Sequence, residues 1–229
     1  MNNKGFTLVE LIVSLAAGLV VMGAIYAATE MGQRSSVAVE RKVVAQQNAR
    51  AALDIMALEI GMASFNPNFA TGIWKEGPAG ACGSISGNQI YKGIQEATAT
   101  SITIEMDIDA SSAIGDATSE IIRYNYDTGN QYITRSTNCG GAQAFLGAQT
   151  GNPRDVRVVN NTAGVSLFRY YDGAGTELVP GTDLPARIPD IRRIRITPVV
   201  DTEAIDQSLN RRRRTISSTS IIPRNHAIN

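Results

Sequence analysis

The sequence predicts an α+β protein in which one long N-terminal helix packs on an antiparallel β-sheet. Three observations lead to this prediction. An uncharged apolar run covers residues 11–29, small apolar residues then recur at helical spacing as far as Ala63, and alternating segments follow one another from Ser101 onward. Strands that follow strands after a single helix are typical of antiparallel sheets, because parallel pairing needs a long crossover between strands.

The composition excludes several classes of protein. The 229 residues include 21 basic and 21 acidic side chains, so the chain lacks the global positive field of a protein built to grip nucleic acid. A hydrophobic content of 43% with 18% charged residues argues against a disordered chain and against a multi-span membrane protein. Much of the hydrophobicity lies at the N-terminal end.

The apolar run Leu11–Thr29 has nineteen residues and no charge. As a helix it is about 28 Å long, roughly one hydrocarbon thickness. A buried core helix and a cleaved secretory signal are the alternatives. A core helix would show a polar face, whereas this run offers little beyond Ser14, and a secretory signal would end at a cleavage site before polar sequence. We therefore expect a transmembrane segment at about residues 6–29.

Two features before this run are unusual for a plain anchor. Glu10 lies inside an apolar stretch, where insertion scales put the cost of an ionised acid at about 2.5–3.5 kcal/mol for Asp at a helix centre. A short polar stub, residues 1–5, precedes it and ends in Gly5. Cleavage after Gly5 would leave a cationic amine on Phe6, and this amine could pair with Glu10 of a neighbouring chain.

The segment KGFTLVE at residues 4–10, followed by the apolar run, resembles the class III signal of type IV prepilins and type II secretion pseudopilins. The resemblance implies a leader peptide of residues 1–5, cut between Gly5 and Phe6 by an inner-membrane prepilin peptidase. It also implies N-methylation of Phe6 and an assembly role for Glu10. Lys4 precedes the span, which places the stub in the cytoplasm and the body outside.

Beyond the apolar run, apolar residues continue at helical spacing, but charged residues now lie between them. A stripe of small and apolar residues recurs at i, i+3, i+4 and i+7 positions: Ala45, Ala49, Ala52, Leu53, Met56, Ile60 and Ala63. Asn66 and Pro67 end the pattern. A single helix over residues 6–64 would be about 87 Å long, and two helices with a hinge near Gly32 are the alternative. Many major pilins carry a proline in this region, so its absence between Phe6 and Asn66 favours a minor subunit.

The body from residue 65 onward predicts strands and turns. Alternation or β-branched content marks segments 101–107, 122–126, 131–135, 165–171, 191–200 and 215–222. The turn Asp127–Asn130 joins two of them into a hairpin. Pro198 marks an edge or a bulge in another.

Three segments of the chain, at residues 46–54, 168–172 and 215–225, resemble the PilW family of minor pilins and, more distantly, the J-type pseudopilin of type II secretion. The resemblance implies a type IV pilin fold, with the helix 6–64 packed on an exported β-rich domain of residues 65–229. It implies no enzyme and no cofactor. The expected partners are the prepilin peptidase, other minor pilins, the major pilin, the inner-membrane assembly platform and membrane lipid.

The function expected from these features is that of a minor pilin, which primes assembly of a type IV pilus or sits at its tip. The chain would first be a single-pass inner-membrane protein with a periplasmic body, and later part of a pilus at the cell surface. Two alternatives remain open at this point. The chain could be a secretion pseudopilin, or a pilus-tip module that binds a surface or DNA.

Cys82 and Cys139 are the two cysteines. An exported body enters an oxidising space, which favours a disulfide between them over two unpaired thiols. The loop-entropy argument gives about 4 kcal/mol of stabilisation for closing a loop of this length. Two cysteines without clustered histidines do not make a four-ligand zinc site.

The run Arg211–Arg214 is the sharpest charge cluster and a candidate nucleic-acid contact through phosphates. No aromatic residue interleaves it, so it offers no stacking platform for single strands. Such runs are more often solvated loops between strands, and this is the interpretation we favour.

An acidic segment is a candidate calcium site because it contains Asp107, Asp109, Asp116 and Glu120. The EF-hand spacing fails, since Ser112 and Thr118 occupy the positions of the required glycine and glutamate. An exposed acidic turn is the favoured interpretation, with no resident metal. His226, the single histidine, lies near the C-terminus, where fraying is expected. Without a nucleophile elbow or a phosphate-binding loop, the sequence offers no catalytic residue.

Overall fold

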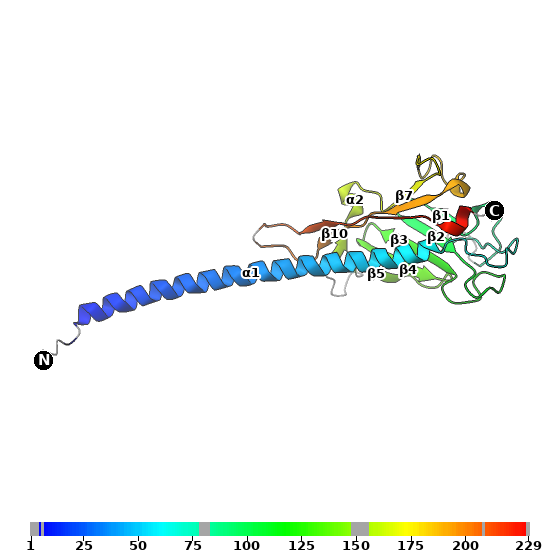
Figure 1. Cartoon of the computed structure of the whole chain (residues 1–229). Helices are drawn as coiled ribbons and strands as arrows, with labels where there is room; N and C mark the ends of the chain where they lie inside the picture. The colour runs from blue at the N-terminus through cyan, green and yellow to red at the C-terminus, as the bar shows by residue number, and fades with distance from the viewer. Residues whose placement is uncertain (1–4, 6, 78–82, 148–155, 208, 228–229) are drawn as a thin grey trace.

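The computed structural model describes residues 5, 7–77, 83–147, 156–207 and 209–227. Helix α1 (Leu8–Gly61) is one continuous element of 54 residues, about 80 Å long at the standard rise. A β-rich body lies along its C-terminal half, while its N-terminal half projects away from the body (Figure 1). The α+β architecture predicted from the sequence is confirmed, and the two-helix alternative with a hinge near Gly32 is wrong.

The largest sheet has five antiparallel strands in the order β1-β2-β3-β4-β5. These are β1 (Ile94–Ala97), β2 (Ser101–Glu105), β3 (Ile121–Asp127), β4 (Tyr132–Thr137) and β5 (Gln143–Leu146), preceded by the short 3-10 helix η1 (Gln89–Tyr91). The predicted hairpin is the β3–β4 pair. Its turn is held by Asp127, whose Oδ1 accepts hydrogen bonds from the backbone N–H groups of Gly129 at 3.0 Å and Asn130 at 2.9 Å.

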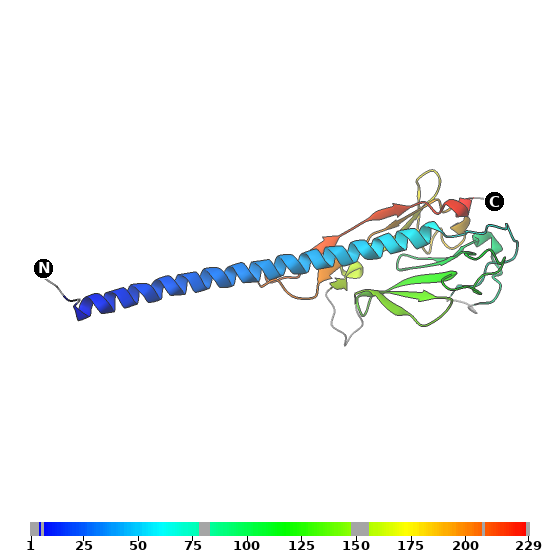
Figure 2. The same ribbon diagram turned by 60° about the horizontal axis from the view of Figure 1, so that its bottom comes forward.

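Two smaller antiparallel sheets complete the body (Figure 2). The four-stranded sheet, in the order β12-β9-β7-β8, contains β7 (Phe168–Tyr171), β8 (Glu177–Leu178), β9 (Arg193–Ile196) and β12 (Thr219–Ile221). The three-stranded sheet, in the order β11-β10-β6, contains β6 (Val156–Val158), β10 (Val199–Thr202) and β11 (Arg214–Ile216). Short helices α2 (Asn160–Ala163), η2 (Ile188–Asp190) and η3 (Arg224–Ala227) connect or follow these strands.

Two segments that we expected to be single strands are each divided between two sheets. Pro198 separates β9 from β10, and Ser217 and Ser218 separate β11 from β12. Proline has no N–H to give to a ladder, so the strand breaks there. The opposite strand breaks at the same level, where Thr197 Oγ1 lies 3.0 Å from Ser218 Oγ. The result is a bent two-stranded ribbon that crosses from one sheet to the other.

The predicted small-residue stripe of helix α1 is its buried face. All seven residues from Ala45 to Ala63 in that stripe are at most 5% exposed, and the helix contacts β5, β10, β11 and β12. Alanines let the helix axis approach the sheets closely, while Met56 and Ile60 fill the space between them, each contributing about 1.5–3 kcal/mol by burial.

An ion pair fixes the same half of the helix to the five-stranded sheet. Glu59 lies off the apolar stripe and forms a salt bridge with Arg135 of β4, with Nη2 and Oε1 2.7 Å apart. The hydroxyl of Tyr124, in β3, also donates to Glu59. The helix is therefore held by charge as well as by apolar packing.

His226, which we expected in a frayed segment, is instead buried, with 1% of its surface exposed. Its Nε2 lies 2.9 Å from the carbonyl oxygen of Ile188, and its Nδ1 lies 2.8 Å from Ser64 Oγ. Since a carbonyl oxygen only accepts, Nε2 carries the proton and Nδ1 accepts from Ser64. Burial lowers the pKa of His226 to about 4, so the ring is neutral at physiological pH.

Candidate functional site

The projecting half of helix α1 begins with a reciprocal cap. Thr7 is the N-cap residue; its Oγ1 accepts from the backbone N–H of Glu10 at 3.3 Å, while Glu10 Oε2 accepts from the backbone N–H of Thr7 at 3.2 Å. Thr-x-x-Glu is a sequence signature of such a capping box, and our sequence analysis missed it by reading Glu10 only as an assembly residue. In the single chain, the Glu10 carboxylate thus stabilises its own helix start.

The predicted cleavage site lies at the limit of the structure. Gly5 is exposed, and a Cβ added to it would meet nothing within 4 Å. Phe6, the predicted methylation site, and residues 1–4 lie outside the described residues. Cleavage after Gly5 and methylation of Phe6 stay predictions.

The apolar segment that follows is exposed along its whole length. The helix has an apolar window with a mean hydropathy of 2.4, long and apolar enough to cross a membrane, and no part of that window is buried in the body. Its serine and threonine hydroxyls are satisfied within the helix, since Ser14 Oγ donates to the Leu11 carbonyl at 3.0 Å and Thr29 Oγ1 to the Ile25 carbonyl at 2.8 Å. Such internal pairing is what a segment without access to water requires.

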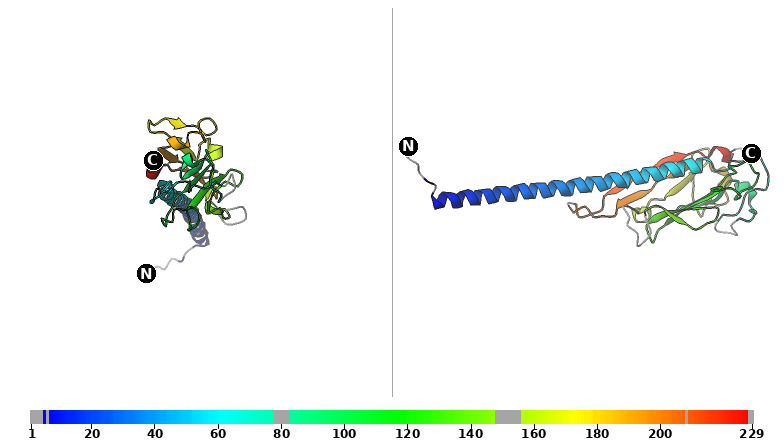
Figure 3. Two further views of the ribbon diagram at one scale, coloured as in Figure 1. Left: turned by 90° about the vertical axis from the view of Figure 1, so that its right-hand side faces the viewer. Right: turned by 90° about the horizontal axis from the view of Figure 1, so that it is seen from below.

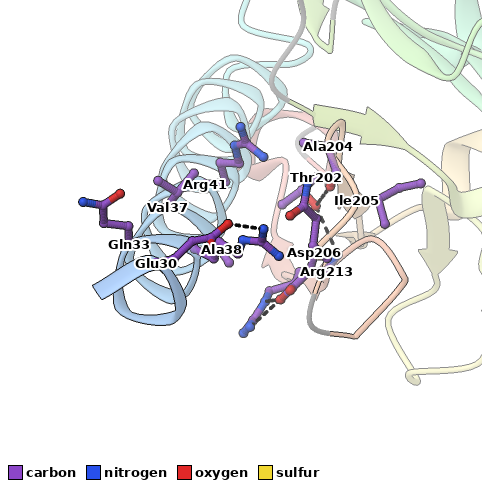
Figure 4. A pocket seen from close by; sticks show the side chains of 12 residues that line it. Glu30, Gln33, Val37, Ala38, Arg41, Thr202, Ala204, Ile205, Asp206 and Arg213 are labelled. Atoms are coloured by element: carbon purple, nitrogen blue, oxygen red, sulfur yellow. Dashed lines mark hydrogen bonds and ion pairs between the residues drawn. The ribbon is translucent and has the colours of Figure 1, made fainter. Parts of the chain in front are cut away.

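Where the apolar segment ends, a hairpin from the body lies beside the helix. The loop between β10 and β11 and helix residues 30–41 enclose an open groove of about 370 Å³. Figure 4 places Glu30, Val37 and Ala38 of the helix on one side, with Asp206 and Arg213 of the hairpin on the other. Sequence reasoning missed this groove because its two walls are far apart in the chain.

The predicted arginine run forms the return arm of this hairpin. Arg214 makes a two-pronged salt bridge with Asp201 at 2.8 and 2.9 Å, and Arg213 pairs with Asp206. Arg212 donates to the carbonyl oxygen of Glu203 at 3.0 Å. These two ion pairs neutralise half of the run, and the charge left for a partner is that of Arg211 and Arg212.

The acidic segment differs from the exposed turn that we expected. Asp107 and Glu120 are buried, and with the exposed Asp109 they bring carboxylate oxygens within 4.8 Å of one another. Asp116, the fourth acid of the predicted site, is not a member of this group. Their oxygens accept backbone N–H groups of the same loop, those of Ser111 and Ser112 on Asp107, and those of Ile108, Gly115 and Ala117 on Glu120. The carboxylates therefore shape the loop.

Cys139 is disulfide-bonded. It lies in the turn after β4, where its φ of 63° is in the left-handed region and Gly140 N–H donates to the Thr137 carbonyl at 2.8 Å. Its expected partner, Cys82, lies outside the described residues, so the pairing itself stays a prediction.

Comparisons with known proteins agree with the N-terminal features. A family model described as the prokaryotic N-terminal methylation motif matches residues 1–26. A type IV-like pilin from Thermus thermophilus is similar in structure, with a TM-score of 0.42 and 9% sequence identity over 80% of this chain and 96% of that one. No curated protein matches the sequence. The chain therefore begins with a prepilin-type methylation motif at the head of a helix long and apolar enough to cross a membrane, and it is type IV pilin-like in this region.

Proposed function

We propose that this chain is a minor pilin of the PilW kind. It is held in the inner membrane by the first half of helix α1 with its body in the periplasm, and is then cut after Gly5 and methylated on Phe6. It next joins an initiating or tip complex with other minor pilins and the major pilin on the inner-membrane assembly platform. Its role is assembly, without catalysis or a cofactor.

One observation supports this proposal above the others: the same helix is exposed and apolar in its first half and buried along one face in its second. Among the large apolar side chains of residues 8–26, exposure ranges from 56% to 75%. A continuous apolar surface of this extent needs a cover, and lipid followed by the helices of neighbouring subunits would supply one. The helix runs to Gly61 without a break, in keeping with the lack of a proline that favours a minor subunit.

The alternatives differ in how well the chain supports them. A type II secretion pseudopilin would share the N-terminal chemistry, and the neighbouring genes, pilus motor against secretin, would separate the two. A DNA-binding tip module has less support, because Arg213 and Arg214 are held in ion pairs. A salt titration of DNA binding tests it; binding that survives replacement of all four arginines by alanine would remove this run as the contact.

Processing is tested by the mass of the protein recovered from the membrane fraction. We expect the loss of residues 1–5 and the gain of one methyl group on Phe6. Gly5→Ala should leave the precursor uncut or slow its cleavage. A mature protein that keeps its first five residues would overturn the proposal.

The role of Glu10 is tested with three variants that separate charge from capping. Glu10→Gln keeps a side chain suited to the capping box but removes the charge, Thr7→Ala removes the threonine side of the box and keeps the charge, and Glu10→Val removes the charge and the glutamate side of the box. We expect both Glu10 variants to stay membrane-inserted and to fail to enter sheared pili, whereas Thr7→Ala assembles. The exposed Glu40, replaced by Gln, is the matched control. Assembly of Glu10→Gln at the wild-type level would rule out charge pairing.

A further inference from the structure

The hairpin between β10 and β11 reaches back along helix α1 toward the apolar segment (Figures 1 and 3). Its residues line a groove together with Glu30, Gln33 and Arg34 of the helix. Gln33 is four residues past Thr29, the end of the apolar run, which is about 6 Å along the helix axis. When the apolar segment spans a membrane, this hairpin is therefore the part of the body nearest to the lipid headgroups.

The hairpin loop exposes apolar side chains at this level. Ile205 and Leu209 are each 48% exposed. Single exposed apolar residues are ordinary on a protein surface. Here, however, the two lie on one loop beside an arginine run, and apolar side chains flanked by basic ones are typical of segments that bind at a membrane interface.

The charge that remains unpaired around this loop is positive. Three ion pairs are internal, namely Arg34–Glu30, Arg213–Asp206 and Arg214–Asp201, and Glu203 pairs with Arg157. Four cations form no ion pair within the described part of the chain: Arg41, Lys42, Arg211 and Arg212. Lys42 and the arginine run also line a second, larger hollow of about 670 Å³ on the same hairpin. Glu40 is the one neighbouring acid on the helix without an ion pair among those residues.

We propose that, while the apolar segment of helix α1 spans the membrane, this hairpin docks on anionic phospholipid headgroups of the leaflet that faces the body. Guanidinium groups bind phosphate oxygens with two parallel hydrogen bonds. Arg211 and Arg212 each supply one such group. The apolar Ile205 and Leu209 enter the interface between headgroups and acyl chains. The attraction falls off within a Debye length, about 10 Å at 0.1 M salt, so the position of the hairpin just beyond the span is essential. The proposal rests on the proposed function in one respect, the insertion of the helix.

Docking at this loop fixes the body against the membrane in one orientation before assembly. The helix alone leaves the body free to rotate about the helix axis, because its apolar surface runs all round. A second contact, off that axis, removes this freedom. The small-residue face of the helix is covered by the body itself, so the orientation decides which outer face of the body meets an incoming subunit.

The test uses the full-length chain reconstituted in vesicles of phosphatidylcholine with or without about one-third phosphatidylglycerol. Leu209→Trp places a fluorophore on the loop, and quenching by brominated lipid reports its contact with the bilayer. Leu58→Trp is the matched control. Leu58 is 69% exposed on helix α1 and lies about 44 Å beyond Thr29 along the helix axis, far from the membrane. Flotation of the vesicles measures helix insertion separately.

We expect quenching of Leu209→Trp in anionic vesicles and little in neutral ones, with none at position 58. Arg211→Gln together with Arg212→Gln should lower the docked-to-free ratio by about fivefold for each arginine, as should added salt, without changing flotation. Inserted protein whose Leu209→Trp signal equals the control overturns this proposal and leaves the proposed function standing.

Three further outcomes would also decide between these possibilities. Equal quenching in neutral and anionic vesicles would show that headgroup charge is not recognised, which overturns the proposal. A double arginine variant that keeps its lipid quenching but loses affinity for duplex DNA would identify a nucleic-acid surface instead. Protein that fails to float would contradict insertion, and with it the proposed function.

Discussion

Ser64 Oγ lies 2.8 Å from Nδ1 of His226, although 162 positions separate the two residues in the chain. The same hydroxyl accepts from the backbone N–H of Gly93 at 3.0 Å, and the backbone N–H of Ser64 donates to the Glu105 carbonyl at 2.9 Å. The first turn after helix α1 is thus joined to β2, to the loop before β1 and to the C-terminal 3-10 helix. This junction closes the end of the body farthest from the apolar segment.

The junction should make the stability of the body depend on pH through His226. Its pKa is about 4 in the fold and about 6.5 when unfolded, so the unfolded chain takes up the proton first as the pH falls. The contribution of His226 to stability is therefore full above pH 6.5 and declines between 6.5 and 4, by on the order of 3 kcal/mol in total. Denaturant unfolding of the detergent-solubilised chain at several pH values measures this. His226→Gln, which does not titrate, should lack this contribution; an identical decline in both proteins would contradict the prediction.

Glu105 should make the stability of the body change with pH in the direction opposite to His226. Burial raises its pKa to about 8, its Oε2 accepts from the backbone N–H of Lys75 at 2.9 Å, and its Oε1 has no hydrogen-bond partner in the described part of the chain. The folded state thus holds a proton that the unfolded chain releases near pH 4.5, and stability is lost as the pH rises from 4.5 through 8. Between pH 6.5 and 8, where His226 is already neutral, we expect a loss of about 2 kcal/mol.

Glu105→Gln separates this effect from general alkaline destabilisation. The amide has the same shape and no charge to release, so the variant should be more stable than the wild type at pH 8 and should show no decline between 6.5 and 8. Glu40→Gln, at an exposed helix position, is the control and should behave as the wild type. A wild-type curve that is flat over this interval would show that Glu105 is ionised in the fold.

Gly93 is required by the same junction. A Cβ at this position would lie 2.3 Å from the Glu105 carbonyl oxygen and 2.3 Å from the Ser64 backbone nitrogen. Both are backbone atoms that cannot turn aside, so Gly93→Ala should cost about 3 kcal/mol or more. The matched control is Gly87→Ala, because its Cβ would meet nothing within 4 Å, and it should change stability by less than about 1 kcal/mol. Equal unfolding midpoints for the two variants would refute this packing.

The parts of the fold that the sequence predicts are those with a local signal. The helix followed from the spacing of Ala45 to Ala63 and from the lack of proline, and the β3–β4 hairpin followed from alternation on both sides of Asp127. The burial of His226 had no such signal, because it depends on Ser64 and Ile188, which tertiary packing alone brings near the C-terminus.

Some features of the candidate site likewise have a local sequence signal, and others do not. The methylation motif and the apolar run can be read directly from the sequence. The sequence names the four acids of the acidic segment, but only the fold of the loop decides that Asp107, Asp109 and Glu120 bring their carboxylate oxygens together. The pairing of Arg213 and Arg214 with acids depends on the close approach of two hairpin arms, which no local pattern specifies.

The salt bridge between Glu59 and Arg135 should make a measurable contribution to the stability with which helix α1 packs on the five-stranded sheet. The two side chains are 18% and 26% exposed, and Arg135 Nε also donates to Glu59 Oε2 at 3.1 Å. Removing one partner leaves the other charge half-buried and unpaired, so Glu59→Gln or Arg135→Gln should each cost about 1–3 kcal/mol. A double-mutant cycle isolates the pair. The control is Arg169 with Glu177, 42% exposed on both sides and 3.8 Å apart, for which the coupling should be below about 1 kcal/mol. Equal coupling energies for the two pairs would mean that burial adds nothing to the salt bridge and that apolar packing alone holds the helix on the body.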